Sequence, residues 1–396
     1  MSAKPGTPAP PTAPGVHPKP FWSFRPRSDR EAGDAVVSNF LLHWFPAKTY
    51  KPSLDWNYSF WLGTASAALF FLLVLSGLPL LLLYVPSVER AYGSVKDIEF
   101  VVTFGSWIRA VHRIAAHLMV AAVFLHLVRV FLTGAYKNGT GRGQRREWNW
   151  VLGVVMIVLT LFLSFTGYLL PWDQLAYWAI TIGANIAQSP REITDAIHVT
   201  EYFDPGGLQR LLLLGSDQVG AEALIRFYLL HVMILPLAIA ALMGVHFWRI
   251  RKDGGMVRPA DADAKLARER HSETYPVFTE APAKTYHLAA IVRGKTSAVG
   301  RGPENTVPSM PHLFYAELGV MMVTLFLCVA LSLFSDAPLK ELANPAIPEN
   351  PAKAPWYFLG LQEMVSFSAF MGGIGIPSIV LIGLSLIHIS EPTRPY

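Results

Sequence analysis

Four histidines lie as matched pairs inside two long apolar segments. His112 and His126 are fourteen residues apart in the first segment, and His231 and His246 are fifteen apart in the second. In an α-helix these steps rise about 21 Å and about 22 Å, and they return to within about 40° and about 60° of the starting face. A histidine in a lipid-spanning helix is costly unless it has a partner or lines a functional cavity. The pairs therefore predict two metal centres stacked across a hydrocarbon layer about 30 Å thick.

Imidazoles from facing helices commonly hold haem iron inside a helical bundle. We therefore expect two non-covalent b-type haems, one bound by His112 and His231 and the other by His126 and His246. His117 also lies in the first segment, but it is about 140° around the helix from His112. We interpret His117 as a structural residue.

Glycines repeat at the same interval as the first histidine pair. Gly63 and Gly77 are fourteen residues apart in one apolar segment, and Gly153 and Gly167 are fourteen apart in another. Small residues let helices approach closely, and a flat macrocycle needs the same clearance. We therefore expect one glycine from each helix to face each haem. Ordinary packing of small residues between helices is the alternative.

Arginines close to the histidines could bind the haem carboxylates, because a guanidinium makes bidentate contacts with a carboxylate. The candidates are Arg109, Arg113, Arg226, Arg129, Arg249 and Arg251. For the last three, interfacial placement of long basic side chains is an equally good explanation.

The composition indicates an all-α, polytopic membrane protein. Of 396 residues, 52% are hydrophobic and 15% are charged, which excludes an ordinary soluble enzyme. Segments long enough to span a membrane are 56–84, 107–133, 151–170, 224–248 and 313–334, and a sixth begins near residue 374. The single cysteine, Cys328, excludes a disulfide framework, a cysteine-ligated iron–sulfur cluster and a Cys-x-x-Cys-His haem attachment site.

Basic residues set the expected orientation. They gather in the N-terminal region, in the connection 137–146 and in the connection 249–301. The stretch between Asp173 and Glu222 is mainly acidic. The positive-inside rule then predicts a cytoplasmic N-terminus, with His112 and His231 near the outer surface and His126 and His246 near the inner one. This topology explains the net charge of +5, so nucleic acid is not an expected partner.

The chain divides into six expected parts. These are a Pro/Ala-rich tail (1–20), a cytoplasmic interfacial segment with an amphipathic helix (21–55), a four-helix di-haem domain (56–252), a cytoplasmic linker (253–311), a C-terminal part with an outer loop and a truncated sixth helix (312–383), and a final stretch (384–396). The final stretch resembles a translated sequencing adapter. We expect the natural sequence to continue differently beyond Gly383, and His388 not to be a ligand.

Three stretches carry a family resemblance. Residues 109–130, 166–174 (Thr-Gly-Tyr-Leu-Leu-Pro-Trp-Asp-Gln) and 226–252 resemble cytochrome b of quinol–cytochrome c/plastocyanin oxidoreductases. The resemblance covers about residues 35–255 strongly and 310–383 more weakly. The fifteen-residue histidine step is similar to that of the chloroplast-type branch and related bacterial proteins.

The resemblance implies an activity and partners. Quinol would be oxidised near the outer surface of a bacterial inner membrane. One electron would pass to a Rieske iron–sulfur protein and on to a c-type cytochrome. The other would cross the two haems to a quinone near the inner surface, with proton translocation. The resemblance also implies a homodimeric complex.

The resemblance further implies a quinol pocket, and here the chain departs from the family pattern. The pocket residues would be Phe165, Gly167, Pro171, Trp172 and Tyr177, together with Trp356 and Tyr357 in the outer loop. Pro355 stands where the family has a proton-accepting glutamate. Glu363, Glu349 and Asp173 are candidate replacements, and our hypothesis is Glu363. Trp61 occupies the position of the cysteine that tethers a third haem in the chloroplast-type subunit, so two haems are expected.

Two other functions remain open from the residues alone. A di-haem membrane anchor of a hydrogenase or formate dehydrogenase would also carry histidine pairs, but it usually lacks the Pro-Trp-Asp-Gln segment and the Trp-Tyr loop. A proton-coupled transporter could use the histidines as a relay, but transporters tend to show broken helices and inverted repeats, which this sequence does not display.

Overall fold

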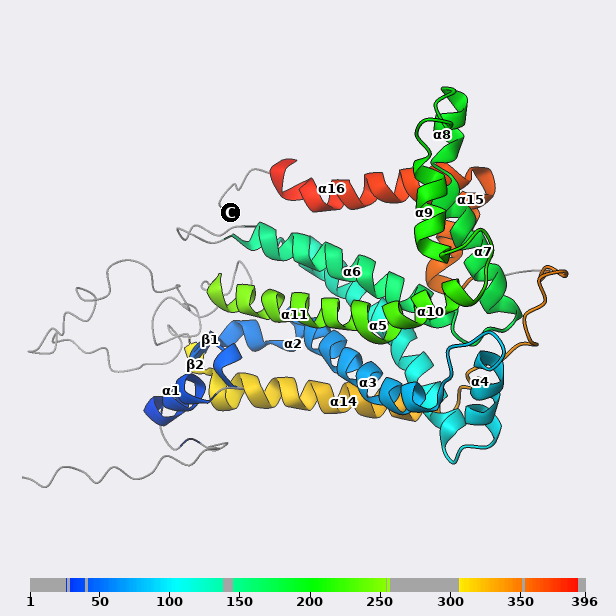
Figure 1. The fold of residues 1–396 in the computed structure, drawn as a ribbon. Coiled ribbons are helices and arrows are strands. Elements are labelled where there is room, and N and C mark those ends of the chain that lie inside the picture. Colours follow the sequence, from blue (N-terminus) through cyan, green and yellow to red (C-terminus); the bar gives the residue numbers. More distant parts are fainter. Residues whose placement is uncertain are drawn as a thin grey trace, which may run out of the picture.

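The protein is described from a computed structural model, which describes residues 26, 29–39, 42–137, 145–253, 255–256, 306–350 and 353–390. Long, roughly parallel helices form a bundle with short elements at both ends (Figure 1). In chain order the elements are α1 (Asp29–Ser38), η1 (Leu42–Trp44), β1 (Lys48–Tyr50), η2 (Lys51–Leu54), α2 (Trp56–Ser59), α3 (Leu62–Leu83), α4 (Ala91–Phe100), α5 (Gly105–Leu132), α6 (Arg146–Tyr168), α7 (Gln174–Gln188), α8 (Arg191–Ala196), α9 (Pro205–Leu214), α10 (Ala221–Leu229), η3 (Leu230–Ile234), α11 (Leu235–Lys252), β2 (Thr306–Pro308), η5 (Ser309–Leu313), α14 (Phe314–Ser332), η6 (Trp356–Phe358), α15 (Leu359–Phe367), η7 (Met371–Gly375) and α16 (Ile376–Ser390).

Within the described residues, five helices are long and apolar enough to cross a membrane. They are Leu62–Leu83, Gly105–Leu132, Arg146–Tyr168, Ala221–Lys252 and Ser309–Ser332. A shorter apolar helix, Met371–Leu386, lies alongside α6. These spans match the apolar runs of the sequence because lipid-facing helices satisfy their own backbone and can be apolar on every side. The predicted class, an all-α polytopic membrane protein, is confirmed.

The first span is shorter than the sequence predicts. The apolar run was expected to form one helix from residue 56, but Phe60 and Trp61 adopt left-handed backbone angles, with φ of 48° and 51°. A right-handed helix cannot pass through this conformation. Four residues therefore form the separate α2, and the spanning helix α3 begins at Leu62. The Trp61 side chain is buried at this break.

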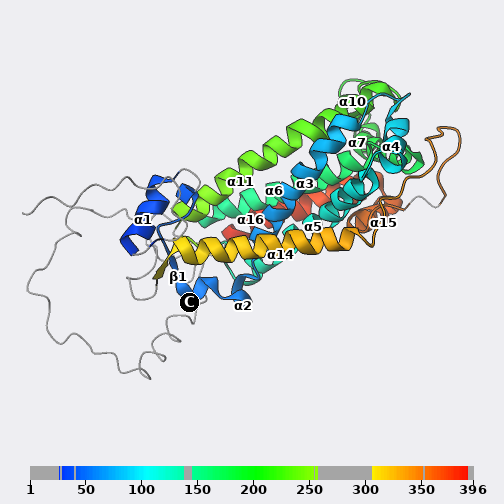
Figure 2. The same ribbon diagram turned by 90° about the horizontal axis from the view of Figure 1, so that it is seen from below.

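The bundle has one end, called here the α1 end, where α1 and the two strands lie (Figures 1 and 2). β1 pairs antiparallel with β2, with Thr49 opposite Val307. Val36, Leu42 and Met310 form a small buried core beneath them. The segment 21–55 was expected to be one interfacial amphipathic helix. It instead contains a short helix and a strand that fasten it to the start of α14, while residues 1–25 lie outside the described residues.

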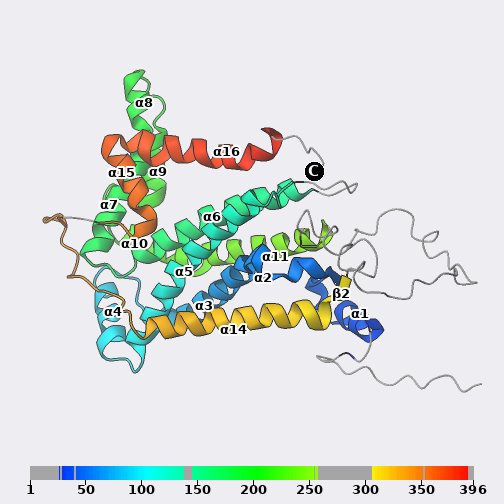
Figure 3. The same ribbon diagram turned by 180° about the vertical axis from the view of Figure 1, so that it is seen from behind.

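The opposite end, the α7 end, carries α4, α7, α8, α9 and α15 (Figures 1 and 3). Sequence reasoning treated most of this region as a connection. In the structure α7 and α9 pack on one another, and their core includes Leu169, Ile180, Leu214, Leu224 and Phe227. This packed pair lies in the chain between the end of α6 at Tyr168 and the start of α10 at Ala221.

Packing between the long helices is closest for α3 with α5 and for α6 with α11. α14 lies against both α3 and α5, and Cys328 is fully buried there beside Leu69 and Ala115. α16 runs beside α6, where Trp150 donates its indole N–H to the Leu384 carbonyl at 2.6 Å. Residues 384–390 continue α16, and most of the expected linker (257–305) and residues 391–396 lie outside the described residues. The hypothesis about the final stretch stays a prediction.

Candidate metal centres and the aromatic loop

The first histidine pair faces across the bundle near the α7 end. His112 on α5 and His231 on η3 have ring centroids 6.2 Å apart and planes inclined by 73°. Imidazole binds first-row metals at about 2 Å, and the ring nitrogen lies about 1 Å from the ring centre, so two opposite ligands of one metal place their centroids about 6 Å apart. The separation fits a single metal ion between the two rings.

Both rings of this pair use the Nδ1 atom for other contacts. The Oγ of Ser76 lies 3.0 Å from Nδ1 of His112. Nδ1 of His231 lies 3.1 Å from the Leu163 carbonyl and 3.3 Å from the Oγ1 of Thr166. A metal-bound histidine generally donates its second N–H to a carbonyl or another oxygen, which fixes the tautomer. Nε2 of each ring is therefore the atom left for a metal.

The second pair lies on the same helices toward the α1 end. His126 is on α5 and His246 is on α11. Within the described part of the chain, the Nδ1 atoms of both rings are buried and make no hydrogen bond. A buried imidazole nitrogen without a partner is costly, although the His246 ring as a whole does interact with the Asn149 backbone. A bound metal would give one nitrogen of each ring a partner, so these residues also fit the predicted centre.

A π turn in the second histidine helix gives its fifteen-residue step about the same rotation as the fourteen-residue step of the first. η3 is a π-helical turn that carries His231, and the N–H of Leu235 bonds to the Leu230 carbonyl five residues back. Pro236 follows this turn; it lacks an N–H, and its ring crowds the preceding turn. A π turn absorbs one extra residue, so fifteen residues here cover about the same rotation as fourteen in a regular helix. The expected offset of about 60° is corrected accordingly, and Pro236 was the sequence signal for it.

Three of the four glycines lie directly against histidine rings. A Cβ added to Gly63 would sit 3.2 Å from Cε1 of His126, and one added to Gly77 would sit 3.3 Å from Cε1 of His112. At Gly167 an added Cβ would collide with the ring of His231. An added Cβ at Gly153 would meet nothing within 4 Å among the described residues. The first three therefore make room for an imidazole, and clearance for a macrocycle stays a prediction.

The predicted haem-carboxylate arginines all have protein partners. Arg109 forms an ion pair with Glu99, and Arg113 donates to the Asp336 carbonyl at 2.7 Å. Arg226 donates to backbone carbonyls at the end of α9. At the α1 end, Arg129 also has an interaction, Arg249 pairs with Asp253 at 2.8 Å, and Arg251 donates to the His43 carbonyl. Their role toward haem stays a prediction.

An aromatic loop docks between α5 and α6 at the α7 end. This loop, Trp356–Phe358, is η6. Trp356 donates its indole N–H to Nδ1 of His117 at 2.9 Å, and the Tyr357 ring lies edge-on to His117 with centroids 5.7 Å apart. Phe358 meets Phe165 edge-on at 6.4 Å. The sequence interpretation of His117 as structural rested on its angle from His112; its contacts with the loop were not visible, because Trp356 lies 239 positions away.

The connection between α6 and α7 lies near this loop. Trp172 is buried in a left-handed backbone conformation, with φ of 53°, and its ring meets Tyr177 edge-on at 6.2 Å. Pro171 immediately precedes it and is partly exposed. The structure therefore brings Pro171, Trp172 and Tyr177 to the same end of the bundle as Trp356 and Tyr357.

Asp173 holds two segments together with its carboxylate. Oδ1 accepts the Ala176 N–H at 2.9 Å and caps α7, and Oδ2 accepts the Lys340 N–H at 3.0 Å. Burial raises the pKa of Asp173, although these two N–H groups act in the opposite direction. The neighbouring Gln174 bonds to the backbone of Asn344 and Ile347. This geometry favours a structural role for Asp173 over proton transfer.

The two candidate glutamates make no hydrogen bond with the aromatic loop among the described residues. Glu363 is exposed on α15, and its carboxylate makes no hydrogen bond or ion pair with the described residues. Glu349 forms an ion pair with Lys340 at 3.5 Å. The structure therefore offers no contact that favours either carboxylate as the proton acceptor.

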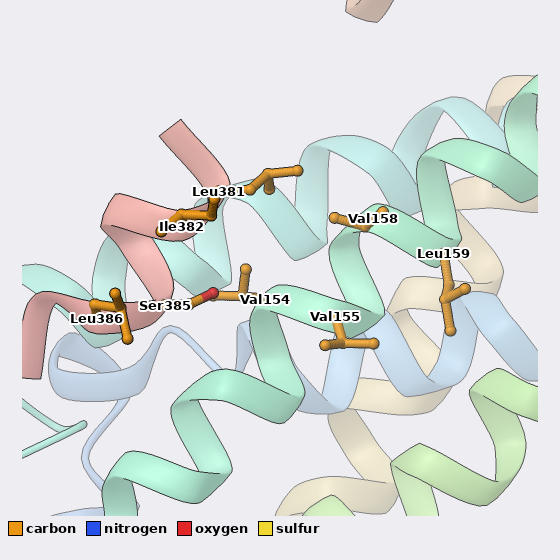
Figure 4. Close-up of a pocket in the computed structure, with 8 residues that line it drawn as sticks. All are labelled: Val154, Val155, Val158, Leu159, Leu381, Ile382, Ser385 and Leu386. Carbon is orange, nitrogen blue, oxygen red and sulfur yellow. The ribbon is translucent and has the colours of Figure 1, made fainter. Parts of the chain in front are cut away.

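A separate apolar cavity of about 360 Å³ lies between α6 and α16. Figure 4 shows a lining that is aliphatic apart from Ser385 and consists of Val154, Val155, Val158, Leu159, Leu381, Ile382 and Leu386. It contains no titratable side chain and does not contribute to the centres described above.

Together, the apolar spans and the facing histidine pairs define a membrane-spanning protein of the haem-binding, electron-transfer class. The family model described as Cytochrome b(N-terminal)/b6/petB matches residues 117–346, and the chain belongs to this family. The match includes His126, His231 and His246 and begins five residues after His112. The predicted resemblance to cytochrome b of quinol oxidoreductase complexes is confirmed.

Individual relatives agree with this assignment. The chain is 41% identical over 203 residues to cytochrome b6 of Heliobacterium mobile, covering 51% of this chain and 87% of that protein. It is 40% identical over 198 residues to cytochrome b6 of Synechococcus elongatus, covering 50% and 84%. The fold is similar to a solved chain titled hyperthermophilic respiratory Complex III, with a TM-score of 0.63, 25% identity, and coverage of 88% of this chain and 78% of that one.

Proposed function

We propose that this chain is the di-haem cytochrome b subunit of a quinol:cytochrome c oxidoreductase. It would oxidise quinol at the α7 end and pass electrons across the membrane, with proton translocation. The observation that carries the proposal is the His112–His231 pair, with centroids 6.2 Å apart and both Nδ1 atoms engaged elsewhere. The second pair lies about 21 Å further along the same helices, so one pair lies toward each membrane surface.

Haem bound at these pairs would supply a one-electron carrier in each half of the membrane. The chain's own residues supply the rest. Four histidines would hold and orient the haem iron, while Ser76 and the Leu163 carbonyl fix two of the imidazoles and Gly77 and Gly167 leave space for the rings. The apolar packing of α3, α5 and α14 keeps water from the path between the centres.

The charge distribution supports an orientation. Arg145, Arg146, Arg249, Arg251 and Lys252 gather at the α1 end. By the positive-inside rule this end, with the N-terminus, faces the cytoplasm of a bacterial inner membrane. Quinol oxidation at the α7 end then releases protons on the outer side.

The aromatic loop supports the position of the quinol site. Trp356 and Tyr357 lie with Phe165 and the Trp172–Tyr177 segment at the end nearest the His112–His231 pair. Flat aromatic walls with a few polar groups suit a quinol ring. The similarity to the Complex III chain supports a Rieske iron–sulfur protein and a c-type cytochrome as partners. The homodimeric complex rests on the family resemblance alone.

An optical spectrum tests the proposal directly. The purified protein should show two low-spin b-type haems, and His112→Ala and His126→Ala should each remove one of them. His198→Gln changes an exposed histidine and should leave both in place. Co-purification of an iron–sulfur protein should accompany the haems. A colourless protein after expression with ample haem would refute the proposal.

A further inference from the structure

His117 presents one basic nitrogen to the aromatic loop. It lies five residues after His112 on α5, which is about 7.5 Å along the helix and about 140° around it. His117 is thus not part of the metal pair. Its Nδ1 accepts the indole N–H of Trp356 at 2.9 Å. A neutral imidazole that accepts at Nδ1 carries its proton on Nε2, so Nδ1 is the lone-pair nitrogen.

The Trp356 indole, which donates to this lone pair, can move away from His117. Trp356 is 52% exposed and lies on the loop between α14 and α15. Its indole N–H donates a hydrogen bond to Nδ1, and a quinol hydroxyl can donate to Nδ1 in the same way. A quinol that replaced the indole would restore the hydrogen bond that the displacement breaks.

The other charged and titratable groups around His117 are poorly suited to accept a proton. Arg113 on the same helix is a permanent cation that bonds to the Asp336 carbonyl. Burial raises the pKa of Tyr357, so its phenol stays protonated. From α6 the titratable side chain at this end is Tyr168, and from α14 it is the buried Cys328, while α3 carries none.

Among the described residues, none of the carboxylates at this end bonds to His117, and Asp336, whose carbonyl accepts from Arg113, is exposed. Asp173 uses both oxygens for backbone N–H groups, and Glu349 is paired with Lys340. Glu363 is exposed on α15. His117 is a base that touches two of the three aromatic side chains of the loop, Trp356 and Tyr357.

Building on the proposed function, we propose that Nδ1 of His117 accepts the proton of quinol, and that the Trp356 indole fills this position until quinol arrives. In the step, one quinol O–H bond breaks and an N–H bond forms at Nδ1, giving the imidazolium. The O–H bonding pair stays on the oxygen of the resulting quinolate anion, and one electron then passes from this anion to a one-electron acceptor, which in the proposed complex is the iron–sulfur protein. The imidazolium then releases its proton to the outer aqueous phase, and the indole returns to Nδ1.

His117→Gln in the purified complex tests the assignment. Glutamine can still accept the Trp356 N–H, but it cannot take a proton. With a short-chain quinol as substrate, kcat should fall at least about a hundredfold, the loss expected for a missing general base. The acid limb of the pH profile, where the imidazole is already protonated, should also disappear. Both haems should remain in the optical spectrum, which separates this result from a failure of the proposed function.

Two controls complete the test. His43→Gln makes the same change at an exposed histidine of the α1 end and should leave the rate and its pH profile as in the wild type. Glu363→Gln tests the rival carboxylate. Wild-type turnover and an unchanged acid limb in His117→Gln, or their loss in Glu363→Gln alone, would overturn the proposal.

A second variant keeps the proposal testable if His117→Gln does not assemble. Trp356→Phe retains an aromatic ring but removes the N–H that competes for Nδ1. The KM for quinol should fall while the acid limb persists, because quinol no longer displaces a donor. An unchanged or higher KM would show that the indole is an anchor and not a stand-in for the substrate.

Discussion

Replacing Gly167 with alanine places a methyl group against the ring of His231, one of the expected ligands of the His112–His231 centre. A Cβ at this position would lie 2.9 Å from both Nδ1 and Nε2 of His231, and closer still to Cε1, whereas ordinary contacts begin near 3.4 Å. The ring must therefore retreat by at least about 0.5 Å, the difference between these distances. This movement also disturbs the 3.1 Å contact between Nδ1 and the Leu163 carbonyl.

The expected magnitude follows from the cost of overpacking. Inserting a methyl group into a packed interior costs about 1–3 kcal/mol. If this free-energy cost displaces His231 from its position as a haem ligand, haem affinity at this centre drops by about 5- to 150-fold. Gly167→Ala should therefore lose haem from the His112–His231 centre and keep the other haem. The loss should be visible as a lower haem-to-protein ratio in reduced-minus-oxidised spectra after dialysis.

Gly319→Ala is the matched control. Gly319 lies on the spanning helix α14, is not one of the glycines expected to face a haem, and its added Cβ meets nothing within 4 Å among the described residues. This variant should retain both haems. If Gly167→Ala also keeps two haems with wild-type spectra, the ring of His231 does not lie where the structure places it and the reasoning fails.

Three further perturbations have defined outcomes. Burial raises the pKa of Asp173 in the folded protein above its unfolded value. The protonated carboxyl therefore stabilises the fold below the unfolded pKa, and this stabilisation is lost as pH rises through the folded pKa. Asp173→Asn should remove this fall in Tm with rising pH from a plot of Tm against pH. Deleting Val232 from the π turn should restore a regular helix with a fourteen-residue step, so both haems should persist in the optical spectrum, and loss of either would contradict the register argument. Ser76→Ala removes the oxygen that lies 3.0 Å from Nδ1 of His112. In a redox titration the midpoint potential of the haem at the His112–His231 centre should move to more positive values. Ser66→Ala is the control and should leave this potential unchanged, because among the described residues the Ser66 hydroxyl bonds within its own helix.

The features that the sequence revealed are those set by local periodicity. Apolar runs of about twenty residues define the spans, because the thickness of the hydrocarbon layer fixes their length. The histidine interval returns to nearly the same face of a helix, so the two histidines of each helix point in a similar direction. The family resemblance rested on short stretches around these residues, and the family match confirmed it.

The features that the sequence did not reveal depend on contacts between distant segments. Asp173 was a candidate proton acceptor because a carboxylate is visible in a sequence, while the Lys340 N–H that occupies it is 167 positions away. His117 had no visible partner until the loop at Trp356 folded onto it. The π turn was hidden because regular helical arithmetic cannot detect an inserted residue, although Pro236 marked the place.

Asp173, Gln174 and the strand-like bridge to Leu342 make a joint between the four-helix part and the residues that follow α14. At the opposite end the β1–β2 pair fastens the same two parts, and between them α14 packs along α3 and α5. Covalent continuity between residues 256 and 306 is thus not what keeps the halves together. A chain cut there should therefore remain assembled as two polypeptides.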